Sequence, residues 1–348
     1  MTWLTWRQFR PSALPVLALL AALLGALALA PMPDVDPDRL IRDLVAGGPA
    51  VTVYTVALLA LIGLPAAVGV FWGAPLVARE LEAGTHRLVW AQSVSRSRWL
   101  ASKLGLIGLT AVAGAALLSL LFTWWCAPID RALNAGQAAP SGPLQLPRLD
   151  PLIFIGRGIA PVGYTAFAFA LGVAAGTVLR RTVPAMAITL ILFTAVQVTW
   201  PELVRSKLFA VTYTTVLTAE NVRGMEVRIP QGSSTPDAVR GMRVEVDKPG
   251  AWVPVNQTVD RNGTAQSALP PWVASCVPAG VPGPPPGERI KRDPNCWKRL
   301  AEAGYRQQVS YIPANRFWAL QAVETAIFLG LALLLAGGTF WWVRHRVT

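Results

Sequence analysis

Residues 51–78 read VTVYTVALLALIGLPAAVGVFWGAPLVA, a run that contains no charged residue. An α-helix rises about 1.5 Å per residue, so this run is long enough to cross about 30 Å of hydrocarbon. Other stretches have the same character, and only Arg157 and Glu324 interrupt them with charge. These stretches are residues 11–30, 104–129, 151–179, 182–201 and 317–343. The sequence therefore predicts an all-α polytopic membrane protein with six transmembrane helices.

The Lys and Arg residues that flank these stretches predict their orientation. With the N-terminus inside the cell, the inside segments hold eleven such residues and the two short outside loops hold four. The inside residues are Arg7, Arg10, Arg79, Arg87, Arg96, Arg98, Lys103, Arg180, Arg181, Arg344 and Arg346, and the outside residues are Arg39, Arg42, Arg131 and Arg148. Because short loops rich in Lys and Arg stay in the cytoplasm, both termini are predicted to be cytoplasmic. The net charge of +12 thus needs no nucleic-acid partner, and no nucleic-acid recognition motif is present.

The first stretch also resembles a cleavable signal peptide. Arg7 and Arg10 precede it, and Ala28-Leu29-Ala30 at its end resembles a cleavage site. However, Pro31 follows directly, and the apolar run is longer than the usual core of such a peptide. We therefore expect an uncleaved helix.

Residues 202–315 form a long insertion between the fifth and sixth stretches, in which polar residues, Gly and Pro replace the apolar runs. Apolar and polar residues alternate over residues 225–229 and 242–246, which predicts strands. Residues 295–304 predict a short helix that ends at Gly304. The insertion is thus expected to be an extracytoplasmic α+β domain. The predicted order is residues 1–201 with five helices, residues 202–315 outside, and residues 316–348 with the last helix and a cytoplasmic tail.

The cysteines also fit an outside location for this insertion. Cys276 and Cys296 both lie within it, and an extracytoplasmic compartment is oxidising. We therefore predict a disulfide between them, with two free thiols as the alternative. Cys126, near the end of the third stretch, is expected to be a buried, small apolar side chain.

Signatures of catalysis and of metal binding are absent from the sequence. The histidines are His86 and His345, and no His-Glu-x-x-His, paired-cysteine zinc spacing or Gly-x-Ser-x-Gly occurs. No phosphate-binding Gly-x-x-x-x-Gly-Lys-Ser/Thr occurs either. We therefore expect a non-catalytic chain without a cofactor or metal of its own, and any ATP would bind to another chain.

Residues 79–103 read RELEAGTHRLVWAQSVSRSRWLASK, a segment too polar to span a membrane and too long for a tight turn. Gly84 and Thr85 indicate a break, after which Thr85 can cap a short helix. Leu88 and Trp90 alternate with cations, so this helix can lie on the membrane surface or dock into a groove on a partner. An ordinary anchoring loop is the remaining alternative.

Several polar residues recur at defined spacings along this segment: Glu80, Glu82, Gly84, Thr85, Gln92, Ser93, Arg96, Arg98, Trp99 and Lys103. Their order resembles the cytoplasmic loop of type-2 ABC exporter permeases, most closely the actinobacterial branch. Residues 6–10 resemble the amphipathic entry helix of such permeases. Residues 180–187 resemble their junction between the fourth and fifth spans, and residues 315–324 the start of their last span.

The resemblance implies that the short helix of the loop receives motion from a separate ABC ATPase subunit, which holds ATP and Mg²⁺. The residues that would contact this partner are Glu80, Glu82, Gly84, Thr85, Arg87, Leu88 and Trp90. The resemblance also implies a second permease subunit, in a homodimer or a heterodimer, in the plasma membrane of a bacterial cell.

A polar side chain inside a membrane costs free energy, so each such residue is expected to have a partner or a function. Arg157, Gln197, Gln321 and Glu324 are expected at similar depth in the outer half, and Gln321 and Glu324 share a helix face. We predict a polar cluster around an Arg157–Glu324 pair. One interpretation is that the cluster lines an outward vestibule on the path of the substrate. A purely structural ion pair, or an Arg157 that extends outward to water, is the alternative. Gly172 and Gly176 have the spacing that permits close helix approach.

Two functions remain after these exclusions. The first is the membrane-spanning subunit of an ABC exporter that moves a hydrophobic or amphipathic substrate. The alternative is a membrane sensor whose outside domain binds a ligand and signals through the loop. A membrane-embedded enzyme is disfavoured because the catalytic groups are missing.

Overall fold

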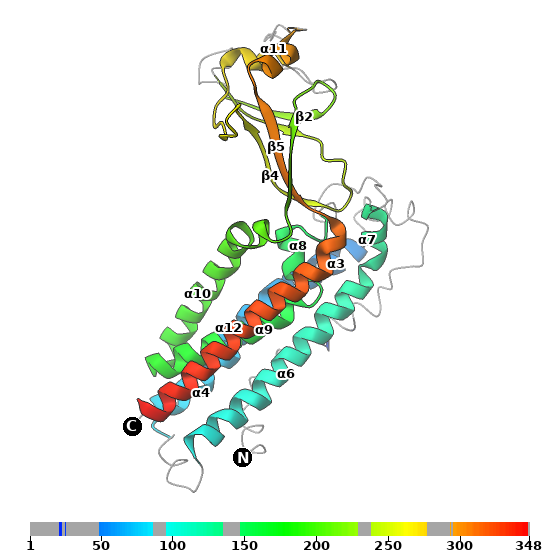
Figure 1. The fold of residues 1–348 in the computed structure, drawn as a ribbon. Coiled ribbons are helices and arrows are strands. Elements are labelled where there is room, and N and C mark those ends of the chain that lie inside the picture. The colour runs from blue at the N-terminus through cyan, green and yellow to red at the C-terminus, as the bar shows by residue number, and fades with distance from the viewer. Residues whose placement is uncertain are drawn as a thin grey trace. The chain divides into compact units, whose positions relative to one another are not determined.

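The computed structural model describes residues 21–22, 25, 49–85, 95–134, 147–228, 238–276, 293 and 295–346. The chain divides into a helical unit, Met1–Arg205 with Ala314–Thr348, and a β-rich unit, Ser206–Pro313 (Figure 1).

Five helical segments in the described part of the chain are long and apolar enough to cross a membrane. They are Val51–Glu82, Arg96–Trp125, Ala160–Leu179, Thr182–Lys207 and Ala314–His345. Each of them overlaps one of the last five predicted stretches. The predicted first helix, residues 11–30, lies outside the described residues except at positions 21, 22 and 25.

The first of these segments contains a π-helical turn. Helix α3 (Pro49–Val68) continues through η1 (Gly69–Gly73) into α4 (Ala74–Glu82) without a loop. The next segment, α6 (Arg96–Trp125), begins earlier than predicted because Ser95 caps it, its hydroxyl accepting a hydrogen bond from the Arg98 N–H. The short helix α7 (Ala127–Asn134) follows it.

The predicted fourth helix, residues 151–179, is wrong as a single element. It consists of α8 (Pro151–Ile155) and α9 (Ala160–Leu179), separated by a turn. Gly158 has a φ of +69°, a left-handed conformation that a helix interior does not contain. Pro161 then lies in the first turn of α9, where its missing N–H costs nothing.

The last two helices of this unit are α10 (Thr182–Leu203) and α12 (Phe317–His345). The 3₁₀ turn η3 (Arg205–Lys207) follows α10, and η5 (Ala314–Arg316) precedes α12.

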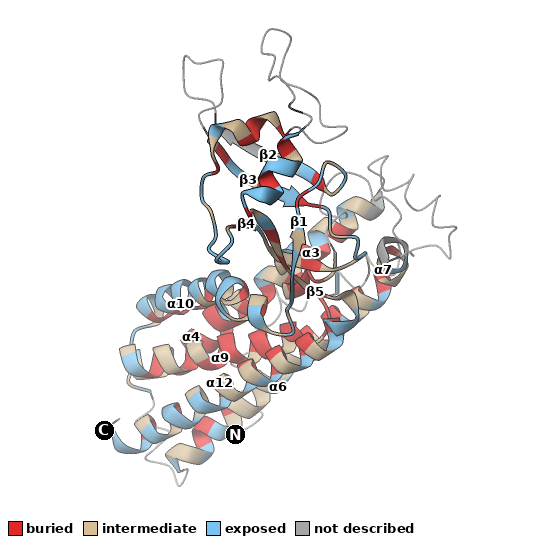
Figure 2. Cartoon of the chain, turned by 45° about the horizontal axis from the view of Figure 1, so that its top comes forward, coloured by how far each residue is buried: buried red, intermediate tan, exposed pale blue. Residues whose placement is uncertain are grey.

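Helix α9 is at the centre of the helical unit and packs against α12, α4, η1, α10, α6 and α3. In its most apolar stretch 61% of the residues are buried, more than in the other four described spans, and its ribbon is largely red in Figure 2. Glycines permit this packing. A Cβ on Gly172 would lie 2.3 Å from the Gly69 carbonyl oxygen, and one on Gly176 would lie 2.4 Å from the Ala74 carbonyl oxygen. The predicted close approach at Gly172 and Gly176 is thus confirmed.

The β-rich unit contains a sheet of three antiparallel strands in the order β1 (Val211–Val216), β5 (Arg306–Ile312) and β4 (Trp252–Val259). A separate antiparallel pair consists of β2 (Val222–Arg228) and β3 (Ala238–Val244), with Met225 opposite Met242. The two predicted strands correspond to β2 and β3. The predicted short helix is α11 (Cys296–Glu302).

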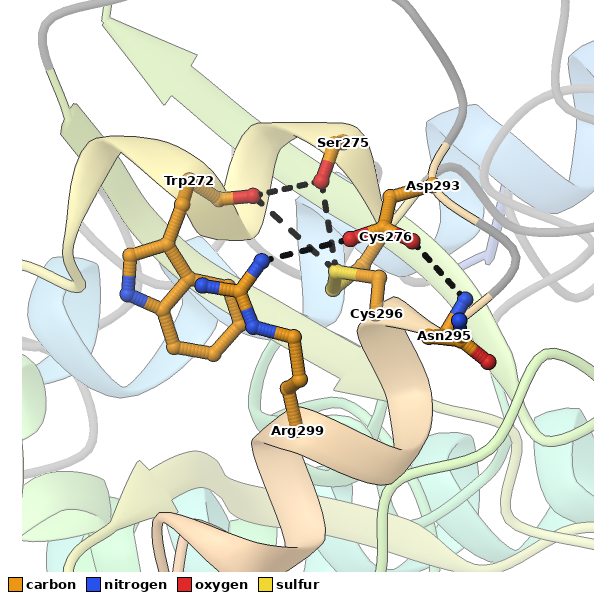
Figure 3. The surroundings of a disulfide bond; sticks show 7 residues. All are labelled: Trp272, Ser275, Cys276, Asp293, Asn295, Cys296 and Arg299. Carbon is orange, nitrogen blue, oxygen red and sulfur yellow. Dashed lines mark hydrogen bonds and ion pairs between the residues drawn. A yellow bond between two sulfur atoms is a disulfide. The ribbon is translucent and has the colours of Figure 1, made fainter.

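The predicted disulfide between Cys276 and Cys296 is confirmed, and it joins the 3₁₀ turn η4 (Pro271–Ser275) to α11 (Figure 3). Beside it, the Arg299 guanidinium lies over the Trp272 ring, 4.7 Å from its centroid, and pairs with Asp293. Both sulfurs belong to the buried core of this unit. Cys126, in the helical unit, is free and buried, as predicted.

Candidate functional site

The turn between α8 and α9 leaves backbone groups without helical partners, and side chains from other helices bind them. The Gly158 N–H donates to the Thr123 hydroxyl at 2.7 Å, and the Ala160 N–H donates to Gln321 Oε1 at 2.6 Å. The amide nitrogen of Gln321 donates to the Phe154 carbonyl at 3.3 Å. One amide side chain from α12 thus connects the end of α8 to the start of α9. Non-helical backbone inside a membrane requires such satisfaction from the protein.

Arg157 lies in this turn and is 2% exposed. Its guanidinium makes two parallel hydrogen bonds to Asp130 in α7, of 2.9 Å and 2.6 Å. The predicted Arg157–Glu324 pair is therefore wrong. The physical reason is that α7 brings a carboxylate from just beyond the third span to the broken helix, and two charge-assisted bonds satisfy Arg157 there.

Glu324 of α12 pairs instead with Arg205, which follows α10. Arg205 donates to both carboxylate oxygens, through Nε at 3.0 Å and through one terminal nitrogen at 2.7 Å. The Tyr164 hydroxyl donates to the same carboxylate and accepts a 3.0 Å hydrogen bond from Arg205. Arg205, Glu324 and Tyr164 are all fully buried. The guanidinium also lies over the Phe154 ring, 4.2 Å from its centroid.

Sequence reasoning missed Arg205 and Asp130, because both fall just past the ends of apolar stretches and were assigned to outside segments. Their proximity to those ends was the available signal. Arg205 lies four residues beyond Pro201, and Asp130 lies one residue beyond the third stretch. A charge so near a helix end can reach back into the bundle.

Gln197 shares no hydrogen bond with Arg157, Gln321 or Glu324. Its side-chain oxygen and nitrogen are both buried, with no hydrogen-bond partner among the described residues. The indole nitrogen of Trp200, one turn further along α10, is in the same situation. The Trp200 ring packs against Phe328 of α12 with a centroid distance of 4.9 Å. Gln197 is therefore the predicted site residue whose hydrogen-bonding capacity is unused within the described part of the chain.

The loop between α4 and α6 is attached to its own chain at its base. Glu80 pairs with Lys103 of α6, and both side chains are largely buried. Glu82, the last residue of α4, accepts hydrogen bonds from Thr182 at the start of α10. Gly84 has a φ of +70°, which confirms the predicted break after α4.

Of the other residues predicted to contact a partner, the structure describes Thr85 but not those that follow it. Thr85 is exposed, and its hydroxyl lies 3.5 Å from the Glu80 carbonyl oxygen. Arg87, Leu88 and Trp90, together with the predicted short helix, lie outside the described residues.

The titratable groups do not form a metal site in the part of the chain that the structure describes. There, no group of three or more His, Cys, Asp or Glu side chains is arranged to hold a metal ion. Four described carboxylates of the helical unit form ion pairs or bind the start of a helix: Glu80, Glu82, Asp130 and Glu324.

Comparison with known proteins gives a family match over part of the chain. No curated protein and no solved structure matches the chain. The family match extends from before α3 to Arg205 and therefore includes Glu80, Lys103 and Arg157, while Glu324 lies beyond it. Residues 38–205 of this membrane protein match the family described as ABC-2 membrane transporter related.

Proposed function

We propose that the chain is the membrane-spanning permease subunit of an ATP-driven ABC exporter. ATP and Mg²⁺ bind to a separate ATPase subunit, and this chain moves a hydrophobic or amphipathic substrate outward. The observation that carries the proposal is the family match over residues 38–205, which covers three of the five described spans and all but the last two residues of a fourth. Both termini are cytoplasmic, and a second permease subunit completes the transporter.

The contact with the ATPase subunit is made by the loop of residues 79–103. The buried Glu80–Lys103 pair fixes the base of this loop by joining the end of α4 to the start of α6. Arg87, Leu88 and Trp90, near its middle, supply the cationic and apolar side chains that a protein groove accepts. Glu80 and Glu82 hold the loop in place, while these three residues contact the partner.

The substrate path follows the face of α10 that carries Gln197. Arg157 and Glu324 are each bound to a partner within the bundle, so their charges are satisfied. Gln197 and Trp200 have buried polar atoms without partners among the described residues, and a substrate can use them. Gln321 and Glu324 maintain the shape of the bundle beside this face.

The test is co-purification with the ATPase subunit and ATP-dependent efflux from inverted vesicles. Arg87→Glu and Leu88→Asp should reduce co-purification or abolish efflux, because they place an acid at the contact. Arg240→Glu, the same charge reversal at an exposed site in the β-rich unit, is the matched control and should have no effect. Normal efflux and normal co-purification of both loop variants would contradict the proposal. Ligand binding without ATP-dependent movement would favour the sensor alternative.

A further inference from the structure

Glu82 forms a connection between two elements that are 100 residues apart in sequence. Its Oε2 atom accepts a 3.0 Å hydrogen bond from the Thr182 backbone N–H and a 2.8 Å hydrogen bond from the Thr182 hydroxyl. Glu82 is the last residue of α4, and Thr182 is the first residue of α10. The carboxylate thus occupies the cap position of a helix to which it does not belong.

Helix α10 has no cap of its own. Its N-cap residue is Arg181, whose side chain makes no capping hydrogen bond and carries no acceptor atom. Pro184, in the first turn, has no N–H, so few free backbone donors exist at this end. Glu82 takes one of them, and its negative charge lies at the positive end of the helix dipole.

The two carboxylates at the end of α4 hold different neighbours in different ways. Glu80 forms a buried ion pair with Lys103 of α6, with side chains that are 17% and 7% exposed. Glu82 is exposed, so water can replace its bonds to Thr182 at little cost. The connection to α6 is therefore the harder of the two to break, and the connection to α10 can open and close.

Among the five described spans, helix α10 is also the one with the smallest buried share. Only 17% of the residues in its most apolar stretch are buried, against 61% for α9. A helix with so little lateral packing depends more on attachments at its ends. The Glu82 bonds are the attachment next to the loop.

We propose that Glu82 is a positioning residue that transmits movement of the loop at residues 79–85 to the start of α10. This rests on the proposed function, in which the loop receives motion from the ATPase subunit. When the loop moves with Glu82, the first turn of α10 either follows the carboxylate or loses its cap. Helix α10 carries Gln197, so the connection links the site of ATP-driven motion to the proposed substrate path.

The presence of the cap is tested first, on the full chain in nanodiscs, by hydrogen exchange of residues 183–190. Glu82→Ala should speed exchange in this segment by roughly two- to fivefold, as expected for the loss of a helix cap. Glu220→Ala removes an exposed carboxylate from the β-rich unit and should leave exchange unchanged. Unchanged exchange in Glu82→Ala would overturn the inference.

A second experiment separates transmission from simple stabilisation. Thr182→Pro deletes the N–H and the hydroxyl that Glu82 binds, yet proline is favoured at the first position of a helix. Arg181 already has the extended conformation that precedes proline, with φ −134° and ψ 130°. Thr182→Ser keeps both donors and serves as the matched control.

The complex with the ATPase subunit is compared with and without ATP and vanadate. In the wild type and in Thr182→Ser, exchange at residues 79–85 and at residues 183–190 should change together. In Thr182→Pro, only residues 79–85 should respond. A response of α10 that persists in Thr182→Pro, or that is missing from the wild type, would show that Glu82 transmits nothing. If residues 79–85 themselves ignore ATP, the proposed function fails and this role fails with it.

Discussion

Helices α9 and α10 are consecutive and nearly equal in hydrophobicity, but the protein holds them differently. Helix α9 is fixed along its length, because Gly172 and Gly176 let its backbone approach that of η1 and α4. Helix α10 packs on one side and exposes large apolar side chains on the other. It is held at its ends, by Glu82 at the start and by Arg205 just after the last turn. A helix held in this way can move as a rod, while α9 serves as the fixed support.

The largest expected effect is at the Arg205 attachment. Arg205→Leu should destabilise the helical unit by about 3–5 kcal/mol, because it leaves the buried Glu324 carboxylate without its cation. The double variant Arg205→Leu/Glu324→Leu should lose less than the sum of the two single variants. Stability is measured by unfolding in mixed detergent micelles.

The matched control for this cycle is the pair Arg157→Leu and Glu324→Leu. These residues bind different partners, so their effects should add to within about 0.5 kcal/mol. Additive effects of Arg205→Leu and Glu324→Leu would mean that Arg205 does not hold the end of α10.

The next largest effect on stability is expected in α9, the fixed support. Gly172→Ala places a Cβ 2.3 Å from the Gly69 oxygen and 2.7 Å from the Ala74 nitrogen, both of which are backbone atoms. We expect a loss of about 3 kcal/mol from overpacking, seen as a lower midpoint in the same unfolding assay. Gly330→Ala in α12, which meets nothing within 4 Å, should be neutral or slightly stabilising. Equal tolerance at the two positions would contradict the close packing of α9.

Substitution of Gln321 should have a smaller effect on stability, because its side chain binds only the turn where α9 begins. Gln321→Leu removes the side-chain acceptor of the Ala160 N–H and one of the hydrogen bonds to the Phe154 carbonyl, which keeps its bond from the Arg157 N–H. This should cost about 2 kcal/mol. Hydrogen exchange should increase at residues 154–162 and stay constant in α10. An increase spread over both helices would show that the two are held as one unit.

The smallest effect is expected on the exposed face of α10. Ile191 is 65% exposed, so Ile191→Ala should change stability by about 0.5 kcal/mol or less. Val173 of α9 is fully buried, and Val173→Ala should cost about 2 kcal/mol in the same assay. A large loss from Ile191→Ala would mean that another surface covers this face, and the contrast between the helices would then be smaller.

The sequence predicts the parts of this structure that depend on local composition. Long apolar runs gave the five described spans, and two cysteines in an expected oxidising segment gave the disulfide. Hydropathy does not predict the break at residues 156–159, because the average over a window hides Gly156 and Gly158. The break depends on the hydrogen-bond acceptors that Gln321 and Thr123 supply from other helices.

The ion pairs were missed for a related reason. Arg157, Glu324, Arg205 and Asp130 can be paired in more than one way, and depth along a helix does not decide which pairing forms. The observed pairing depends on the turn that carries Arg157 and on the direction of α7, which are tertiary features. The unused polar atoms of Gln197 are likewise visible only once its neighbours are placed.

The π-helical turn at Gly69–Gly73 also determines the direction in which the side chains of α4 point. Each residue of an α-helix advances the side-chain direction by about 100°, so a turn that holds one extra residue rotates the rest of the helix by that amount. Glu80 and Glu82 face Lys103 and Thr182 only with this rotation included. Removing one residue from the turn would leave the hydrophobicity of the span intact and yet direct both carboxylates away from their partners. The contacts that attach the base of the loop to two other helices thus depend on a turn near the middle of the span, far from the loop itself.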